Sequence, residues 1–163
     1  MTQTQLERTE DRLAAQLQEL TDKAAIADVI HNYAAGVDGH DWTLFRSCFA
    51  DDLEADFTSL KDMGHFRGSS DAWVAAAKVL MENLDATQHL MGNIQVELDG
   101  DRAVARNYLH AQHVRNDELG ERHYIIAGHY RHEMVRTDRL NSLKKRDPTL
   151  GAAIDALDLD VVD

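Results

Sequence analysis

The side chains best suited to chemistry in this sequence are a carboxylate and an imidazole that lie far apart in the chain. Asp38 ends a segment of helical spacing, and His89 begins a long run of alternating polar and apolar residues. A carboxylate beside a histidine is the simplest proton-transfer pair, because it orients the ring and stabilises its cation while the ring accepts a proton. Spacing alone also allows a plainer interpretation, in which Asp38 only caps its helix.

Other catalytic chemistries find less support. His110 and His113, and likewise His129 and His132, have the H-x-x-H spacing of metal ligands. Both pairs fall in segments of strand character, where residues three apart point to opposite faces, so one pair cannot chelate one ion and we expect no metal. The sequence contains no Gly-x-Ser-x-Gly elbow and no glycine-rich phosphate loop, and Cys48 lies on the apolar side of a short helix. Acid–base chemistry is what remains.

The elements that must position Asp38 and His89 are helices first and strands second. Helical periodicity covers two segments at the N-terminus, with Thr21 expected to cap the second of them, and predicts two further helices. The four expected helices cover residues 5–20, 21–38, 41–49 and 71–83. Alternating patterns predict strands at residues 53–57, 65–67, 89–98, 102–115 and 122–136. Helices followed by a mainly antiparallel sheet form an α+β layout.

The chain divides into three expected parts. Residues 1–20 form an N-terminal helical extension, residues 21–138 form the main domain, and residues 139–163 form an atypical C-terminal tail. In the tail, residues 150–157 have a helix-like pattern after Pro148, and no strand that would close the sheet is evident.

Bulk composition narrows the function classes. The chain has 163 residues, 44% of them hydrophobic, which suits one globular domain. A formal net charge of −12 speaks against nucleic acid or anionic lipid as a partner, since phosphate binding needs clustered Lys and Arg. There is no long apolar run and no apolar leader, and a single cysteine fits a reducing compartment. We therefore expect a cytoplasmic protein, with no membrane partner, that binds a small apolar organic ligand.

Three motifs resemble the signatures of SnoaL-like proteins in the nuclear transport factor 2-like superfamily. They are AAIADVIHNYAAGVDGHDW at 24–42, HLMGNIQVELDGDRAVA at 89–105 and GHYRHEMVRTD at 128–138. The resemblance covers about residues 20–138. It implies a cone-shaped, curved, mainly antiparallel β-sheet packed on N-terminal helices, an α+β barrel, and self-association into a homo-oligomer, either a dimer or a trimer.

Within this superfamily the chain is similar to scytalone dehydratase, lindane dehydrochlorinase and bile-acid 7-alpha-dehydratase. Those enzymes use an Asp–His dyad in an apolar cone without a cofactor, and the resemblance places the dyad on Asp38 and His89. The tyrosine of the bile-acid enzyme falls on Tyr33. Substrate contacts are expected from one residue of the early strands and three of the later ones, namely Phe57, Leu109, His113 and Tyr130. Phe57 stands where the dehydratases have a tyrosine, so one phenolic donor is missing.

The resemblance implies a cofactor-independent lyase of the dehydratase type, or an isomerase, acting on a small apolar ring system such as a steroid, polyketide or terpenoid. His89 would be the general base and Asp38 its orienting partner. Tyr33 or Tyr130 would assist the leaving group or an enolate. The alternative is a non-catalytic ligand-binding or assembly domain on the same fold, which the missing phenol and missing closing strand favour. Strand parity raises one conflict, because the apolar residues within 94–98 would lie on the face opposite His89 unless a bulge intervenes.

Overall fold

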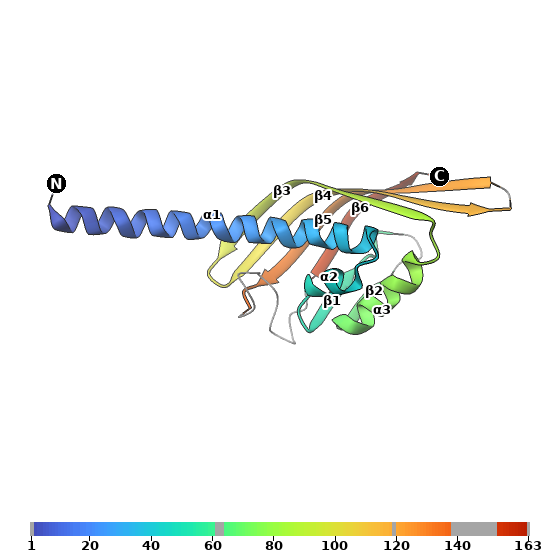
Figure 1. Cartoon of the computed structure of the whole chain (residues 1–163), viewed down its shortest axis with the longest axis horizontal. Coiled ribbons are helices and arrows are strands. Elements are labelled where there is room, and N and C mark those ends of the chain that lie inside the picture. The colour runs from blue at the N-terminus through green and yellow to red at the C-terminus, as the bar shows by residue number, and fades with distance from the viewer. Residues whose placement is uncertain (1, 61–63, 119, 138–152, 163) are drawn as a thin grey trace.

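The computed structural model describes residues 2–60, 64–118 and 120–137 with their side chains, and residues 153–162 as backbone. Within these residues the chain forms two helices, two short strands, a third helix and then four further strands. The strands form one curved sheet in the order β2-β1-β6-β5-β4-β3. Figure 1 shows the long helix α1 crossing one face of the sheet, with α2 and α3 grouped near its C-terminal end. The predicted fold class, a curved mainly antiparallel sheet packed on N-terminal helices, is confirmed.

Helix α1 (Gln3–Asp38) is continuous, so the predicted break with Thr21 as an N-cap is wrong. The Thr21 hydroxyl donates instead to the carbonyl oxygen of Leu17 at 2.9 Å, the i−4 bond that a threonine can make inside a helix. The expected boundary between residues 20 and 21 therefore falls within one helix. Figure 1 shows the N-terminal half of α1 projecting beyond the sheet. Its leucines are exposed there, whereas Ile26, Ile30 and Val37 of the second half are buried in the core.

The end of α1 lies very close to helix α2 (Trp42–Ser47). Asp41 caps α2, since its Oδ1 accepts a hydrogen bond of 2.9 Å from the backbone N–H of Leu44. A Cβ built on Gly36 would lie 2.7 Å from the backbone nitrogen of Phe45, closer than real Cβ contacts come. Gly36 is thus a buried position where only glycine lets the two helices approach this closely.

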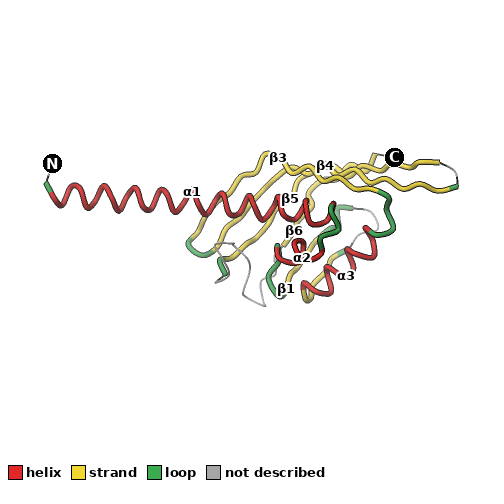
Figure 2. The backbone as a smooth tube through the Cα atoms, viewed as in Figure 1, coloured by secondary structure: helices red, strands yellow, loops and turns green. Residues whose placement is uncertain are grey.

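The predicted strands and the predicted helix over residues 71–83 are present with small shifts in their ends. The elements are β1 (Asp52–Asp56), β2 (His65–Ser69), α3 (Ser70–Met81), β3 (Ala86–Asp99), β4 (Arg102–Asp117) and β5 (Gly120–Val135). Strands β3, β4 and β5 pair antiparallel along their whole length, and Figure 2 shows them as the long curved strands of the sheet. In β4 the buried residues alternate with more exposed ones along most of the strand, as the period of the sequence predicts.

The C-terminal segment corrects a second prediction. Residues 153–162 form strand β6 (Ala153–Val162), so the predicted helix over 150–157 is wrong where it overlaps this strand, and residues 138–152 lie outside the described part of the chain. Strand β6 pairs antiparallel with β5 and parallel with β1, and so joins the two parts of the sheet. The run Leu-Asp-Leu-Asp-Val at 157–161 alternates with period two, which favours a strand over a helix.

A bulge in β3 removes the parity conflict. The pairing of β3 with β4 shifts register between Gly92 and Gln95, and Asn93 has a φ of 53°. One extra residue reverses the faces of the strand beyond it. The His89 side chain is therefore buried on the same side as Ile94 and its apolar successors, which pack against the core.

Candidate active site

Asp38 and His89 meet at the C-terminal end of α1. His89 Nδ1 lies 2.6 Å from Asp38 Oδ1, and the backbone N–H of His89 donates to Asp38 Oδ2 at 2.7 Å. The Thr87 hydroxyl donates to Asp38 Oδ1 at 2.8 Å. Burial alone would raise the pKa of the Asp38 carboxyl, but these hydrogen bonds outweigh it and hold the pKa below its ordinary value. The group is therefore a carboxylate at neutral pH, with its position fixed by three donors.

The carboxylate also fixes the orientation and the tautomer of the His89 ring. The His89 side chain is only 5% exposed, and its Nδ1 is engaged by Asp38. A neutral imidazole that donates through Nδ1 presents the lone pair of Nε2, which is the nitrogen that can accept a proton. His89 also lines a cavity, so its ring can contact a molecule bound there.

The cavity has a volume of about 280 Å³ and a mainly apolar, aromatic wall. Six of the seven residues singled out in the sequence line it, and Asp38 is the exception, since it contacts the His89 ring without lining the cavity. The six are Tyr33, Phe57, His89, Leu109, His113 and Tyr130. They come from α1, β3, β4 and β5 and from the residue that follows β1, so the sheet and the helices together bring the set into one space.

Two tyrosines form a buried pair in this wall. The rings of Tyr33 and Tyr130 are 6.4 Å apart at 78°, and their hydroxyl groups are hydrogen-bonded. Burial raises the pKa of Tyr33 to about 12, and burial raises the pKa of Tyr130 well above its ordinary value. The shared hydrogen bond lowers the pKa of Tyr33 and raises that of Tyr130, but burial is the larger effect at both. Both phenols are therefore protonated at neutral pH.

His113 is a second imidazole in the wall. It is 2% exposed, its ring stacks on Tyr124 at 4.4 Å, and it meets the His89 ring edge-on at 5.4 Å. Burial, with a smaller effect from the nearby His89, lowers the pKa of His113 to about 4. His113 is therefore neutral at physiological pH, and its buried Nδ1 has no hydrogen-bond partner among the described residues.

Helix α3 and the end of β1 supply the opposite wall. Phe57 is buried and stacks face to face on Trp73 of α3, with ring centroids 5.7 Å apart and an interplanar angle of 7°. Trp73, Ala77 and Met81 of α3 also line the cavity. Phe57 and Trp73 therefore form an apolar, aromatic part of the cavity wall.

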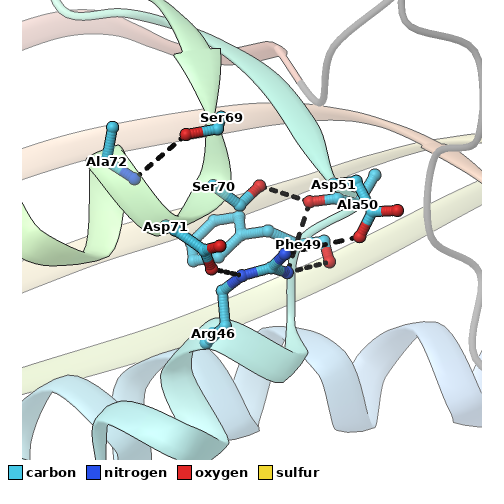
Figure 3. Close-up of polar contacts among 8 residues, drawn as sticks. All are labelled: Arg46, Phe49, Ala50, Asp51, Ser69, Ser70, Asp71 and Ala72. Atoms are coloured by element: carbon cyan, nitrogen blue, oxygen red, sulfur yellow. Dashed lines mark hydrogen bonds and ion pairs between the residues drawn. The ribbon is translucent and has the colours of Figure 1, made fainter.

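A polar clamp holds the N-terminal end of α3 against the turn before β1 (Figure 3). Arg46 Nε donates to Asp71 Oδ1 at 2.6 Å, and its Nη1 donates to the carbonyl oxygens of Phe49 and Ala50 at 3.3 and 3.4 Å. Ser69 caps the helix by accepting a hydrogen bond from the backbone N–H of Ala72, and the Ser70 hydroxyl donates to Ala50. The clamp fixes the end of α3 that carries Trp73.

The histidine pairs with H-x-x-H spacing divide between the two faces of the sheet. His110 is exposed whereas His113 is buried, and His132 is bound to Asn107 through Nε2 and Oδ1 at 2.8 Å. Among the residues described with side chains, no group of three or more His, Cys, Asp or Glu is arranged to hold a metal ion. In the same part of the chain, none of the helices has the length and apolar content needed to cross a bilayer.

Two residues of the site were missed in the sequence. Thr87 binds the Asp38 carboxylate and lies two residues before His89, so strand parity alone places both on one face. Trp73 is the second, and nothing in its local sequence distinguishes it from an ordinary core residue. Only the packing of α3 on the residue after β1 brings its ring to the cavity.

Comparison with known proteins agrees with the fold. The SnoaL-like domain model matches residues 18–145. A protein from Kribbella flavida aligns with a TM-score of 0.74 at 25% identity, over 87% of this chain and 95% of the other. Hexachlorocyclohexane dehydrochlorinase LinA type 2 aligns with a TM-score of 0.70 at 20% identity, over 91% and 93%. A scytalone dehydratase-like protein from Novosphingobium aromaticivorans aligns with a TM-score of 0.70 at 18% identity, over 89% and 90%. No curated protein matches the sequence. The family model covers most of the chain, and the chain belongs to the SnoaL-like domain family.

Proposed function

We propose that the protein is a cofactor-independent lyase that removes a proton from a small, mainly apolar ring compound and expels a leaving group from the neighbouring carbon. The observation that carries this proposal is the 2.6 Å contact between Asp38 and His89, with the His89 ring in the wall of an apolar cavity. Two of the structurally similar proteins have a dehydratase-like or dehydrochlorinase name, which supports elimination as the reaction class.

His89 Nε2 is the proposed base. It takes the proton from carbon, and the electrons of that C–H bond form the new double bond as the leaving group departs with its own bonding pair. Asp38 stabilises the imidazolium that results, because its carboxylate remains ionised and bonded to Nδ1. Tyr33, with a pKa of about 12, stays protonated and donates to a departing hydroxyl or to an enolate oxygen.

An isomerase would use the same three groups, with His89 returning the proton to another carbon. A binding or assembly role without turnover is the alternative that the missing phenol at Phe57 favours. Elimination is preferred because a buried, carboxylate-bound histidine is a costly way to line a cavity that only binds an apolar ligand.

The size of the cavity limits the substrate. A protein cavity of about 150 Å³ holds one benzene molecule. A cavity of about 280 Å³ is nearly twice as large and fits two fused rings better than the four rings of a steroid. The substrate class we propose is therefore a bicyclic compound of polyketide or terpenoid type that carries a leaving group next to an acidic C–H.

The test is turnover of a panel of hydroxylated bicyclic ketones by the wild type and by His89→Ala. We expect kcat/KM to fall by about 10²- to 10⁴-fold, the usual contribution of a positioned base. Asp38→Asn should lower it in the same direction, because the amide no longer stabilises the imidazolium. His110→Ala is the matched control, since this histidine is exposed on the outer face of β4. Equal turnover by the wild type and His89→Ala would remove the base from the mechanism.

A further inference from the structure

The N-terminal half of α1 carries a row of exposed leucines. The row consists of Leu6, Leu13, Leu17 and Leu20, which are 42%, 55%, 66% and 66% exposed. Every residue from 2 to 20 is exposed except Thr9, which is half-buried, so nothing in the described part of the chain covers the row. An isolated helix is only marginally stable in water, and a contiguous exposed apolar patch marks an interaction surface. The leucine row therefore points to a partner.

The row cannot be covered by the sheet of its own chain. Where α1 crosses the sheet, Ile26, Ile30 and Val37 are buried in the core. At about 100° per residue, the centre of the leucine row lies about 130° around the helix from these three side chains. Figure 1 shows α1 as one helix that continues past the edge of the sheet. The leucines consequently face away from the sheet, on the side of α1 that is open to solvent.

The spacing of the row is that of a two-stranded coiled coil. Three of the four leucines are spaced by seven residues, which assigns them to position d of a heptad, and Leu17 then occupies position a. Ala24 and Ala27 continue positions a and d on the part of α1 that crosses the sheet, where Ala24 is exposed and Ala27 is half-buried. From residue 6 to residue 28 the helix is about 33 Å long, a little over three heptads. This length is sufficient for two helices to pack side by side.

Charges beside the row define the direction of the partner helix. Lys23 falls at position g, and Asp28 falls at position e of the next heptad. In a parallel pair, position g of one helix lies beside position e of the other, so Lys23 of each copy meets the partner's Asp28. Asp28 is exposed, and the Lys23 side chain is 40% exposed although it also contacts Glu19. In an antiparallel pair, g faces g and e faces e, and these opposite charges would not meet.

We propose that α1 pairs in parallel with the same helix of a second copy of this chain, through the leucine row and its continuation at Ala24 and Ala27. Two-fold symmetric pairs are the commonest protein oligomers. Because the row faces away from the sheet, the two sheets lie on the outer sides of the helix pair and do not collide. Glu10 occupies a position a, where it faces its counterpart, so the pair forms at a cost in stability. The inference is independent of the proposed function, because these residues are not among those that line the cavity.

The first test measures the dimer dissociation constant of the full chain by sedimentation velocity over a range of concentrations. Leu13→Glu places a charge in the middle of the row, at an exposed side chain outside the core. We expect the Kd to rise by about 10²-fold or more, because the dimer loses two apolar contacts and buries two carboxylates. Leu90→Glu is the matched control, since Leu90 is 57% exposed on the outer face of β3. The Kd of this control should equal that of the wild type.

The second test exchanges the charges beside the row. Lys23→Glu alone places two carboxylates side by side, and Asp28→Lys alone places two ammonium groups side by side, so each change should raise the Kd by about 10-fold at low salt. The double variant restores opposite charges and should return the Kd to near the wild-type value. Residues five apart in one helix do not face each other, so this recovery requires a second copy. Glu10→Leu should lower the Kd, because it replaces two facing carboxylates with leucines.

Four outcomes would overturn the inference. A wild type that stays monomeric at its highest soluble concentration would refute a second copy as the partner of the row. Equal Kd values for Leu13→Glu and the wild type would place the contact elsewhere, and loss of the dimer in Leu90→Glu instead would place it on the outer face of the sheet. A double charge variant that is no tighter than either single variant would refute the parallel arrangement. None of these results affects the proposed lyase, which is judged by the turnover of His89→Ala.

Discussion

Buried His132 gives a prediction about stability that can be worked out from the structure. Its side chain is 9% exposed, and its Nε2–H donates to Asn107 Oδ1 at 2.8 Å. Burial lowers the pKa of His132 to about 4, against an ordinary value of 6.5. A proton added to Nδ1 would place a full charge among buried side chains, so the folded protein resists it while the unfolded chain accepts it.

The sign follows from which state holds more protons. Between about pH 6.5 and pH 4 the unfolded chain protonates His132 and the folded protein does not, so the free energy of unfolding falls as the pH falls through this window. The window is about 2.5 pH units wide, and at about 1.4 kcal/mol per unit it represents about 3 kcal/mol. Below about pH 4 both states are protonated, and His132 contributes no further loss.

The perturbation is His132→Gln, which removes the titrating group and keeps an N–H donor for Asn107. Urea unfolding of the wild type and the variant at several pH values from about 7 to 4 gives the two slopes. We expect the variant to lose about 3 kcal/mol less than the wild type over this range, whatever its stability at neutral pH. A slope remains in the variant, because burial also lowers the pKa of His113 to about 4. His110→Gln, on the outer face of β4, controls for the substitution itself. Parallel slopes for wild type and His132→Gln would refute the reasoning.

Two further predictions concern the position of α1. Gly36→Ala should lower the free energy of unfolding by about 1–3 kcal/mol, because the new Cβ would lie 2.7 Å from the Phe45 backbone nitrogen, and a denaturant titration that shows no loss would contradict the close approach. Arg136 donates to both carboxylate oxygens of buried Asp22, so Arg136→Leu should cost about 3 kcal/mol by leaving that charge unpaired. The double variant with Asp22→Leu should recover much of this loss in the same titration, and a purely additive result would show that the pair is not coupled.

Part of this protein can be obtained from the sequence because the signals are local. The alternation in β3, β4 and β5 reflects the two faces of a strand, and the spacing of Ile26, Ile30 and Val37 reflects the turns of a helix. These periods predicted the elements and the α+β class. The caps at Asp41 and Ser69 are equally local, since each satisfies a backbone N–H three residues away. The resemblance of three motifs to a known family added the candidate site residues, among them Asp38, His89 and Tyr33.

Local signals also failed where two structures compete for the same residues. A threonine before an aspartate at Thr21 is typical of a helix start, yet the hydroxyl bonds within the helix and the chain continues. The segment at 153–157 has small and apolar residues that suit a helix in isolation. Its pairing with β1 and β5, far away in sequence, makes it a strand, because two neighbouring strands satisfy its backbone groups.

The sequence by itself determined the periodic elements, the class of fold and the identity of the acid–base candidates, since each depends on residues close together or on a motif. The tertiary structure alone decided which atoms meet. Asp38 and His89 are 51 residues apart and meet because α1 packs against β3. The bulge at Asn93 keeps the apolar residues beyond it on the same face as His89. The place of the Trp73 ring in the cavity wall likewise depends on the packing of α3 against Phe57, and no local pattern in the sequence records that contact.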